Sequence, residues 1–358
     1  MRRFFFFFFL SLFLAPAVYA KEYPALLRGI RPLGMGGAFT AVADDENAMF
    51  YNPAGLANQS LCIEVINLLT EFTEDSIDLY EDIEETDLDD TAEVVDLLRN
   101  YVGEYEQLRI ALFPNVIWSR DEVGIGVAGL GQVNLTLEIH NPVWPQVETR
   151  LVMDYGVLAG VGIEMPIEDL KVGASLKVIN RESFVETYTA VDIAAEDFEE
   201  RIEDDLKSGT GLGIDIGIIY TEDYSLADVS FGGVVQNIPE MEMDEAEDIK
   251  TQVNLGIAVK PNLDSESVSV IFAFDYMDIG NRIGEDTDLP KRLHLGAEVN
   301  LYERLAFRVG FNQGYISAGF TLDLWILSLD FATYEEEVGF YTGQREDRRY
   351  VGQIAIGW

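Results

Sequence analysis

The side chains that most often carry chemistry in proteins are scarce in this sequence. It contains two histidines, His140 and His294, and one cysteine, Cys62. Two histidines are too few for a histidine-rich metal site, and a single cysteine excludes an internal disulfide. No nucleophile motif accompanies His140, which falls at the end of a predicted strand. We therefore predict no enzyme activity, no metal site and no cofactor.

Two further stretches have compositions that binding sites use. GMGG at residues 34–37 lacks the lysine and the preceding strand of a phosphate-binding loop. Residues 71–98 carry 13 acidic residues and neither lysine nor arginine, but not the D-x-D-x-D-G spacing of a calcium loop. We expect the acidic stretch to be a solvated loop, partly helical over 91–102, and leave divalent bridging to lipopolysaccharide as a hypothesis. The net charge of −40 excludes nucleic acid as a partner, since the chain repels other polyanions.

The first twenty residues have the pattern of an export signal. Residues 1–20 have two arginines, an apolar run and the small residues APAVYA, which is the pattern of a cleaved signal peptide. We predict cleavage after Ala20. No later stretch has 18 consecutive apolar residues, so the sequence predicts no membrane-spanning helix.

The mature sequence alternates apolar and small or polar residues, which is the period of β-strands. In residues 150–163, for example, Leu151, Met153 and Tyr155 share one face, and Asp154 and Gly156 share the other. A two-sheet sandwich with one solvated face is the alternative, but the non-apolar faces are rich in glycine, which suits a crowded barrel interior better. We therefore predict an all-β antiparallel transmembrane barrel of about fourteen strands. The strands are expected near 61–71, 107–119, 122–139, 147–164, 170–190, 209–220, 225–236, 249–260, 266–278, 291–302, 304–312, 314–321, 324–335 and 347–358.

Short and long connections alternate along these strands. Outer-membrane barrels have short periplasmic turns and longer outer loops, so both termini are predicted to be periplasmic, and the acidic loops are predicted to face outward. The inward faces carry as many cations as anions, which indicates ion pairing inside the barrel, with substrate contact by Lys177 or Arg308 as the alternative. The residues counted are Arg150, Lys171, Lys177, Arg181 and Arg308 against Asp154, Asp215, Asp275, Glu298 and Asp330.

The chain ends on YVGQIAIGW, a strand pattern with an aromatic residue at its last position. This pattern resembles the signal that the barrel assembly machinery of diderm bacteria reads on final strands. The matching residues are Tyr350, Ile354, Ile356 and Trp358. The resemblance implies assembly in the outer membrane of a diderm bacterium, with that machinery and outer-membrane lipid as partners.

Residues 31–57, RPLGMGGAFTAVADDENAMFYNPAGLA, are the most distinctive stretch. Their small residues predict two tightly packed helical turns, Met35–Val42 and Glu46–Phe50. Asn52 precedes a proline and is therefore pushed toward an extended conformation.

This stretch resembles the N-terminal signature of FadL-like outer-membrane proteins, and within that group the PorV and PorQ type. The resemblance implies a barrel at residues 61–358 and a hatch segment at residues 21–60 that folds into the lumen. The hatch motif is carried by Gly34, Gly36, Gly37, Asn52, Pro53 and Ala54. In the FadL relatives, long-chain fatty acids and other hydrophobic molecules pass by way of the hatch to a lateral opening in the wall.

Two glycines, Gly129 and Gly131, interrupt the apolar row of one predicted strand. Because glycine weakens strands and marks bulges, they are a candidate lateral opening; the alternative is that a neighbouring aromatic covers them. The charged lumen departs from the apolar track expected for a fatty-acid transporter. Two functions stay open: passive transport of a hydrophobic small molecule, and a PorV-like accessory role that holds a secreted or surface-attached protein partner.

Overall fold

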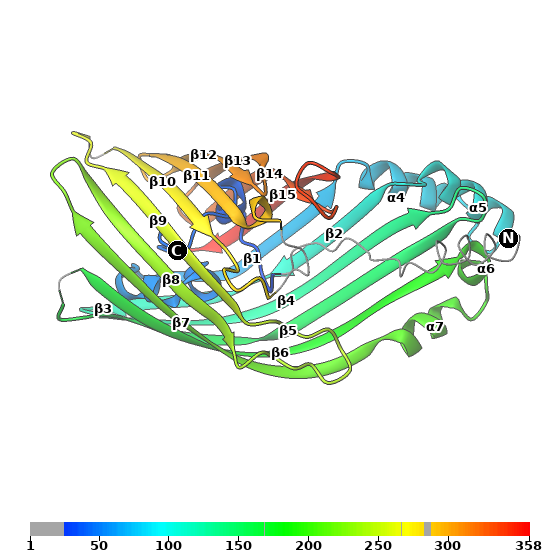
Figure 1. Ribbon diagram of the computed structural model, residues 1–358, viewed down its shortest axis with the longest axis horizontal. Helices are drawn as coiled ribbons and strands as arrows, with labels where there is room; N and C mark the ends of the chain where they lie inside the picture. The colour runs from blue at the N-terminus through cyan, green and yellow to red at the C-terminus, as the bar shows by residue number, and fades with distance from the viewer. Residues whose placement is uncertain (1–24, 168, 266, 283–287) are drawn as a thin grey trace, which may run out of the picture.

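The chain folds into a closed antiparallel β-barrel, as Figure 1 shows for a computed structural model that describes residues 25–167, 169–265, 267–282 and 288–358. Each strand pairs with its neighbours, and β1 pairs with β15 to close the ring. The strands are β1 (Cys62–Thr73), β2 (Tyr105–Leu112), β3 (Asn115–Arg120), β4 (Val123–His140), β5 (Gln146–Glu164), β6 (Leu170–Thr189), β7 (Lys207–Asp223), β8 (Ala227–Ile238), β9 (Gln252–Pro261), β10 (Val268–Tyr276), β11 (Leu293–Leu301), β12 (Leu305–Asn312), β13 (Tyr315–Asp323), β14 (Leu327–Glu337) and β15 (Glu346–Gly357).

Two of these strands share one position in the wall. Both β2 and β3 lie between β1 and β4, so the described residues form a barrel of 14 strands. The predicted fold class and strand number are confirmed. The expectation of one unbroken strand over 107–119 is wrong.

The break falls at Phe113 and Pro114. Proline has no N–H to give to a strand ladder, and the neighbouring β1 shifts its register between Glu64 and Ile66. At this β-bulge Val65 and Ile66 are both exposed, whereas Glu64 and Asn67 turn inward and are joined by a hydrogen bond of 2.7 Å. The pairing with β1 and β4 therefore passes from β2 to β3 at this point. The wall stays closed, because Gly129 N still donates to Pro114 O at 2.9 Å.

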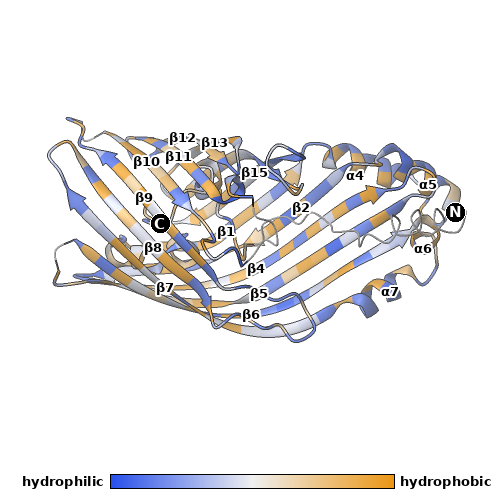
Figure 2. Ribbon diagram, viewed as in Figure 1, coloured by the Kyte–Doolittle hydropathy of each residue, from blue (hydrophilic) through white to orange (hydrophobic). Residues whose placement is uncertain are grey.

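The strands present an apolar face outward and small or polar side chains inward. On β7, Leu212, Ile214, Ile216 and Ile218 are all exposed, while Asp215 between them is fully buried. Figure 2 shows the same alternation of hydrophobic and hydrophilic residues along the strands. Apolar surface faces outward over the length of the strands, as the sequence predicts.

The two ends of the barrel differ. One end, which we call the turn end, carries short connections such as Leu324–Ile326 between β13 and β14. The other, the helix end, carries longer connections and helices, at the right in Figure 1. Those helices are α4 (Ser76–Glu85), α5 (Thr91–Asn100), α6 (Ala190–Ile193), α7 (Phe198–Asp205) and the short η2 (Pro290–Arg292).

The helices at the helix end form a small cluster of their own. Asp90 accepts a hydrogen bond from Ala92 N and so caps α5. The buried stripe of α5, which includes Val94 and Leu97, packs with Leu79 of α4 and Ile139 of β4. The predicted helical stretch at 91–102 corresponds to α5, whereas α4 was not predicted. Among the described residues, no helix is long and apolar enough to cross a membrane.

Residues 25–60, which we call the luminal segment, lie inside the barrel. The segment contains α2 (Ile30–Gly34), α3 (Ala48–Tyr51) and η1 (Pro53–Asn58); α2 contacts β12 to β15, and η1 contacts β3 to β7. The predicted helical turn Met35–Val42 is wrong, because the chain turns at Gly36 and Gly37 with φ of 65° and 86°. The predicted signal peptide and residues 21–24 of the predicted hatch lie outside the described residues.

Inward-facing wall glycines receive the backbone of this segment at distances that no side chain would allow. A Cβ on Gly310 would lie 2.4 Å from Gly36 N, and one on Gly173 would lie 2.3 Å from Pro53 C. Several of these glycines are cross-strand partners, for example Gly232 with Gly256 and Gly296 with Gly310. At Gly126, Gly160 and Gly217 the wall instead receives side chains of the segment, namely those of Met49, Leu56 and Asn52. We call the whole set the glycine belt: Gly124, Gly126, Gly160, Gly162, Gly173, Gly217, Gly232, Gly256, Gly296, Gly310 and Gly319.

Replacing a belt glycine is expected to displace the luminal segment. In Gly310→Val the new side chain would overlap backbone atoms of Met35, Gly36 and Leu295, and overpacking of this kind costs about 1–3 kcal/mol of the free energy of unfolding. Denaturant unfolding of the purified protein, followed by tryptophan fluorescence, measures this loss. Gly352→Val is the matched control, because a Cβ there meets nothing within 4 Å. Equal midpoints for the two variants would contradict the packing argument.

Candidate functional site

Gly36 and Gly37 lie where the luminal segment touches β11 and β12. A Cβ on Gly36 would sit 2.5 Å from Leu295 O, and one on Gly37 would sit 2.6 Å from His294 Nδ1. His294 is buried, and its Nδ1 lies 2.8 Å from Gly36 O. The histidine thus pairs with the backbone of the luminal segment. Gly34 makes a similar approach, because its Cβ would lie 3.1 Å from Gly319 Cα.

Asn52 connects the two halves of the luminal segment to the wall. Its side-chain amide donates to Thr40 O at 2.8 Å and to Ile218 O of β7 at 3.2 Å, and its Oδ1 accepts from Ala54 N. Asn52 and Ala54 are fully buried, and Pro53 lies against Gly173 and Gly217. The structure therefore places the six predicted motif residues against the wall, while their role as a hatch stays a prediction.

Asp275 of β10 holds the middle of the segment. One of its carboxylate oxygens accepts hydrogen bonds from Phe39 N at 2.8 Å and Thr40 N at 2.7 Å. The charge of Asp275 is therefore balanced by backbone donors and not by a cation. The sequence placed Asp275 among the inward charges but gave no signal for this contact.

Arg31 forms the main ionic link between the luminal segment and the wall. Its guanidinium donates to both carboxylate oxygens of Glu298 on β11, each at 2.8 Å. It also pairs with Asp44 at 2.6 Å and Asp45 at 2.9 Å. Such a bidentate pair fixes geometry as well as charge. Sequence reasoning did not identify Arg31, because its bidentate partner Glu298 lies 267 positions along the chain.

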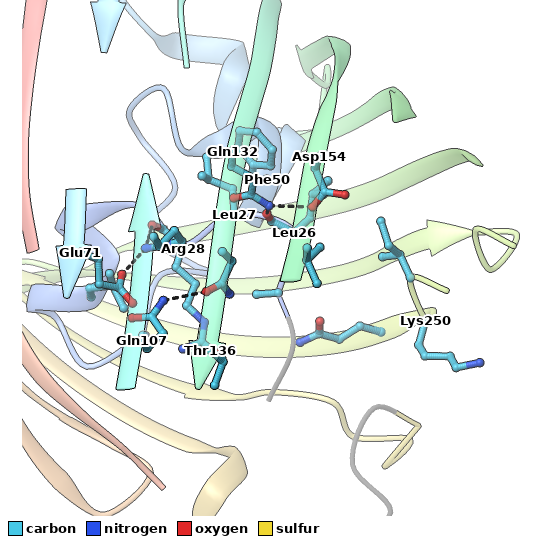
Figure 3. A pocket seen from close by; sticks show the side chains of 18 of the residues that line it. Leu26, Leu27, Arg28, Phe50, Glu71, Gln107, Gln132, Thr136, Asp154 and Lys250 are labelled. Atoms are coloured by element: carbon cyan, nitrogen blue, oxygen red, sulfur yellow. Dashed lines mark hydrogen bonds and ion pairs between the residues drawn. The ribbon is translucent and has the colours of Figure 1, made fainter. Parts of the chain in front are cut away.

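A cavity of about 350 Å³ lies on the helix-end side of the luminal segment. Its floor is made of Leu26, Leu27 and Phe50, and its walls carry amide and charged side chains such as Gln107 and Gln132 (Figure 3). Burial raises the pKa of the Tyr51 phenol, which also lines the cavity and stays neutral. The cavity is therefore apolar below and polar around its sides.

The charged groups of this cavity neutralise one another. Among the described residues, every cation that lines it has a carboxylate partner. Lys177 pairs with Asp215 at 2.8 Å, which matches the predicted pairing inside the barrel. The other pairs are Arg28 with Glu336, Arg109 with Glu71, Arg150 with Glu247, Arg181 with Asp154, and Lys250 with Glu240.

A second cavity of about 380 Å³ lies on the turn-end side. Arg31, Asp44 and Asp45 line it together with Arg308, which pairs with Glu298 at 2.6 Å and donates to Thr321. The luminal segment thus separates two cavities, and Arg31 faces the second one. No group of three histidine, cysteine or acidic side chains placed to hold a metal ion occurs in the described parts of the chain.

Gly129 and Gly131 lie on β4 beside the strand break. Gly131 is opposite Leu112, and a Cβ there would meet nothing within 4 Å; a Cβ on Gly129 would lie 3.5 Å from Pro114 Cγ. The neighbour over Gly129 is thus a proline ring and not an aromatic. The strand ladder continues past both glycines, so a lateral opening here stays a prediction.

The four residues of the expected assembly signal share the outward face of the final strand. Ile354, Ile356 and Trp358 are exposed, and Tyr350 stacks with Phe331 of β14 at a centroid distance of 6.4 Å. Trp358 N also bonds to Ile63 O across the seam with β1. Recognition by an assembly machinery stays a prediction.

Comparisons with known proteins identify relatives in fold. Residues 146–323 match the family model "F plasmid transfer operon, TraF, protein". No curated protein matches the sequence.

The structure is similar to several solved channels. The toluene transporter TbuX of Ralstonia pickettii aligns with a TM-score of 0.55 and 12% identity, covering 92% of this chain and 97% of that one. The toluene transporter TodX of Pseudomonas putida aligns with 0.52 and 10%, covering 96% and 99%. The monoaromatic hydrocarbon channel CymD aligns with 0.52 and 12%, covering 94% and 98%. At these identities, the likeness shows the fold of the barrel.

Removing the Arg31 guanidinium is expected to loosen the luminal segment. Arg31→Met leaves Asp44 and Asp45 without their cation and Glu298 with Arg308 alone, which costs about 2 kcal/mol of unfolding free energy. Trypsin cleavage after Arg28 in the folded protein measures the loosening. Arg99→Met is the control, because the Arg99–Asp96 pair is exposed. Adding Asp44→Asn and Asp45→Asn to Arg31→Met removes the two charges left without a cation and should restore part of the resistance. No difference between Arg31→Met and the control would contradict the role of Arg31.

Proposed function

We propose that this protein is a FadL-like channel of the outer membrane of a diderm bacterium, which passes small molecules with a hydrophobic body. The turn end, where Cys62 and Trp358 lie, faces the periplasm, and the helix end faces outward. Barrel assembly machinery inserts the chain by way of Tyr350, Ile354, Ile356 and Trp358. The apolar outward faces of the strands support insertion in lipid.

One observation carries the transport proposal. The cavity of about 350 Å³ lies on the helix-end side of the luminal segment and has an apolar floor of Leu26, Leu27 and Phe50. This volume is within the range of ligand pockets. Because the floor belongs to the luminal segment, a molecule that rests on it contacts the element that separates the two cavities. The luminal segment then acts as the hatch, and its movement connects them.

A covalent link between the luminal segment and the wall tests this function. Met49 Cγ would lie 3.4 Å from a Cβ on Gly126, so Met49→Cys with Gly126→Cys is suited to a disulfide. In a Cys62→Ser background, we expect the oxidised variant to lose channel-dependent uptake of radiolabelled toluene and para-cresol, because the hatch cannot move. The assay uses a bacterial host without porins of its own, and a reductant should restore uptake.

Each single-cysteine variant in the same background is the control for the substitutions themselves. Uptake that stays unchanged in the oxidised double variant would show that the hatch need not move. Absence of channel-dependent uptake in the unmodified protein would overturn the transport proposal.

A PorV-like accessory role is the second candidate, and the helix end favours it. Helices α4 to α6 pack together through an apolar cluster. Many of their acidic side chains are exposed on the outer side. On α7, Glu199, Glu200 and Glu203 are exposed. This surface suits a cationic protein partner.

A partner of this kind should depend on the α7 carboxylates. In the variant Glu199→Gln, Glu200→Gln and Glu203→Gln, we expect loss of a stoichiometric cross-linked partner in native mass spectrometry of outer-membrane extracts. The control changes three exposed acids near the turn end, Glu222→Gln, Asp264→Asn and Glu303→Gln. Equal recovery of the partner with both variants, or recovery of none with the unmodified protein, would exclude this surface.

A further inference from the structure

The wall formed by β2 and β4 carries polar atoms without partners beside the helix-end cavity. Gln107 and Thr136 face each other in register across these strands. Both line the cavity (Figure 3), and the two residues are only 1% and 6% exposed. Gln107 Nε2 donates to Asn134 Oδ1 at 2.9 Å, but Gln107 Oε1 and Thr136 Oγ1 have no hydrogen-bond partner.

A third atom on the same wall, Nε of Arg109, is a hydrogen-bond donor without an acceptor. Arg109 lies two positions along β2, and its terminal nitrogen is taken by Glu71 and by Arg28 O, whereas its Nε has no partner. The wall thus presents an unused acceptor on Gln107, an unused hydroxyl on Thr136 and an unused donor on Arg109. Buried polar atoms left without partners cost free energy, so a ligand that supplies the missing bonds is favoured.

The charge of the cavity limits the ligand further. Each cation that lines it among the described residues is already held by a carboxylate, as with Lys177 and Asp215 or Arg181 and Asp154. A ligand carboxylate would therefore meet no free counter-ion and would have to lose its hydration shell. A plain hydrocarbon would fill the apolar floor but leave the polar atoms of the wall unpaired.

We propose that the helix-end cavity selects uncharged molecules that combine an apolar body with a hydroxyl group, the chemistry of phenols and alcohols. The apolar body rests on Leu26, Leu27 and Phe50. The hydroxyl group donates to Gln107 Oε1 and accepts from the Thr136 hydroxyl. The terminal torsion of a glutamine side chain is soft, so the Gln107 amide turns toward the ligand. This substrate class rests on the proposed transport function and narrows it.

Three probes that differ only in one substituent test the proposal: toluene, para-cresol and para-toluate. Ligand-observed NMR with the full chain in lipid nanodiscs, corrected with empty nanodiscs, gives a Kd for each. We expect para-cresol to bind about fivefold to tenfold more tightly than toluene, which is the gain from one or two hydrogen bonds. We expect para-toluate to bind most weakly.

Substitutions that keep side-chain size identify the atoms involved. Thr136→Val and Gln107→Met should each weaken para-cresol binding about fivefold and leave toluene binding unchanged. Thr333→Val is the matched control: Thr333 Oγ1 also lacks a partner but does not line the cavity. Thr333→Val should therefore leave para-cresol binding unchanged.

Equal binding of toluene and para-cresol would overturn the hydroxyl preference, as would an equal effect of Thr136→Val on both. A structure solved with para-cresol that shows only ordered water at Gln107 and Thr136 would also overturn it. The disulfide experiment at Met49 and Gly126 reports hatch movement with either probe, so the transport proposal and the substrate class can fail separately.

Discussion

Contact between two backbones, with no side chain between them, determines the interior of this barrel. The luminal segment approaches the wall so closely that a Cβ on Gly310 would lie 2.4 Å from Gly36 N, and a Cβ on Gly36 would lie 2.5 Å from Leu295 O. The glycine belt makes room for this contact across β4 to β9 and β11 to β13. All other luminal features, including the two cavities and the ion pairs at their borders, depend on where the belt holds the segment.

The charged groups inside the barrel complete this arrangement. Arg31 links the segment to Glu298, and Asp275 receives two backbone N–H groups of the turn at Phe39 and Thr40. Wall cations such as Lys177 are paired with carboxylates of neighbouring strands. The lumen is consequently rich in charge but close to neutral. Because buried charges are costly when unpaired, the segment and the wall fit each other in one position.

Much of the fold was predictable from the sequence, since alternation along a strand depends only on local residue order. The outward rows and the strand number follow from it. The strand break at Pro114 was missed, because the apolar row on its outward side, from Leu112 to Val116, continues without interruption. The helical turn over Met35–Val42 was predicted from small residues alone, whereas the wall holds Gly36 and Gly37 at positive φ. The contacts of Arg31 and the pairing of Gln107 with Thr136 depend on barrel register, which local pattern does not contain.

The seam of the barrel lies directly beside the luminal segment in the chain. Only Gln59 to Leu61 separate η1 from β1, and β1 pairs with β15, the final strand. A segment that is made early is therefore enclosed by a ring that a late strand completes, and the ring cannot close on β1 until β15 is present. If the glycine belt is to meet backbone and not solvent, the segment must already lie within the curved sheet when β15 arrives. The order of synthesis thus favours a barrel that closes around the luminal segment. The segment then need not enter a ring that is already closed.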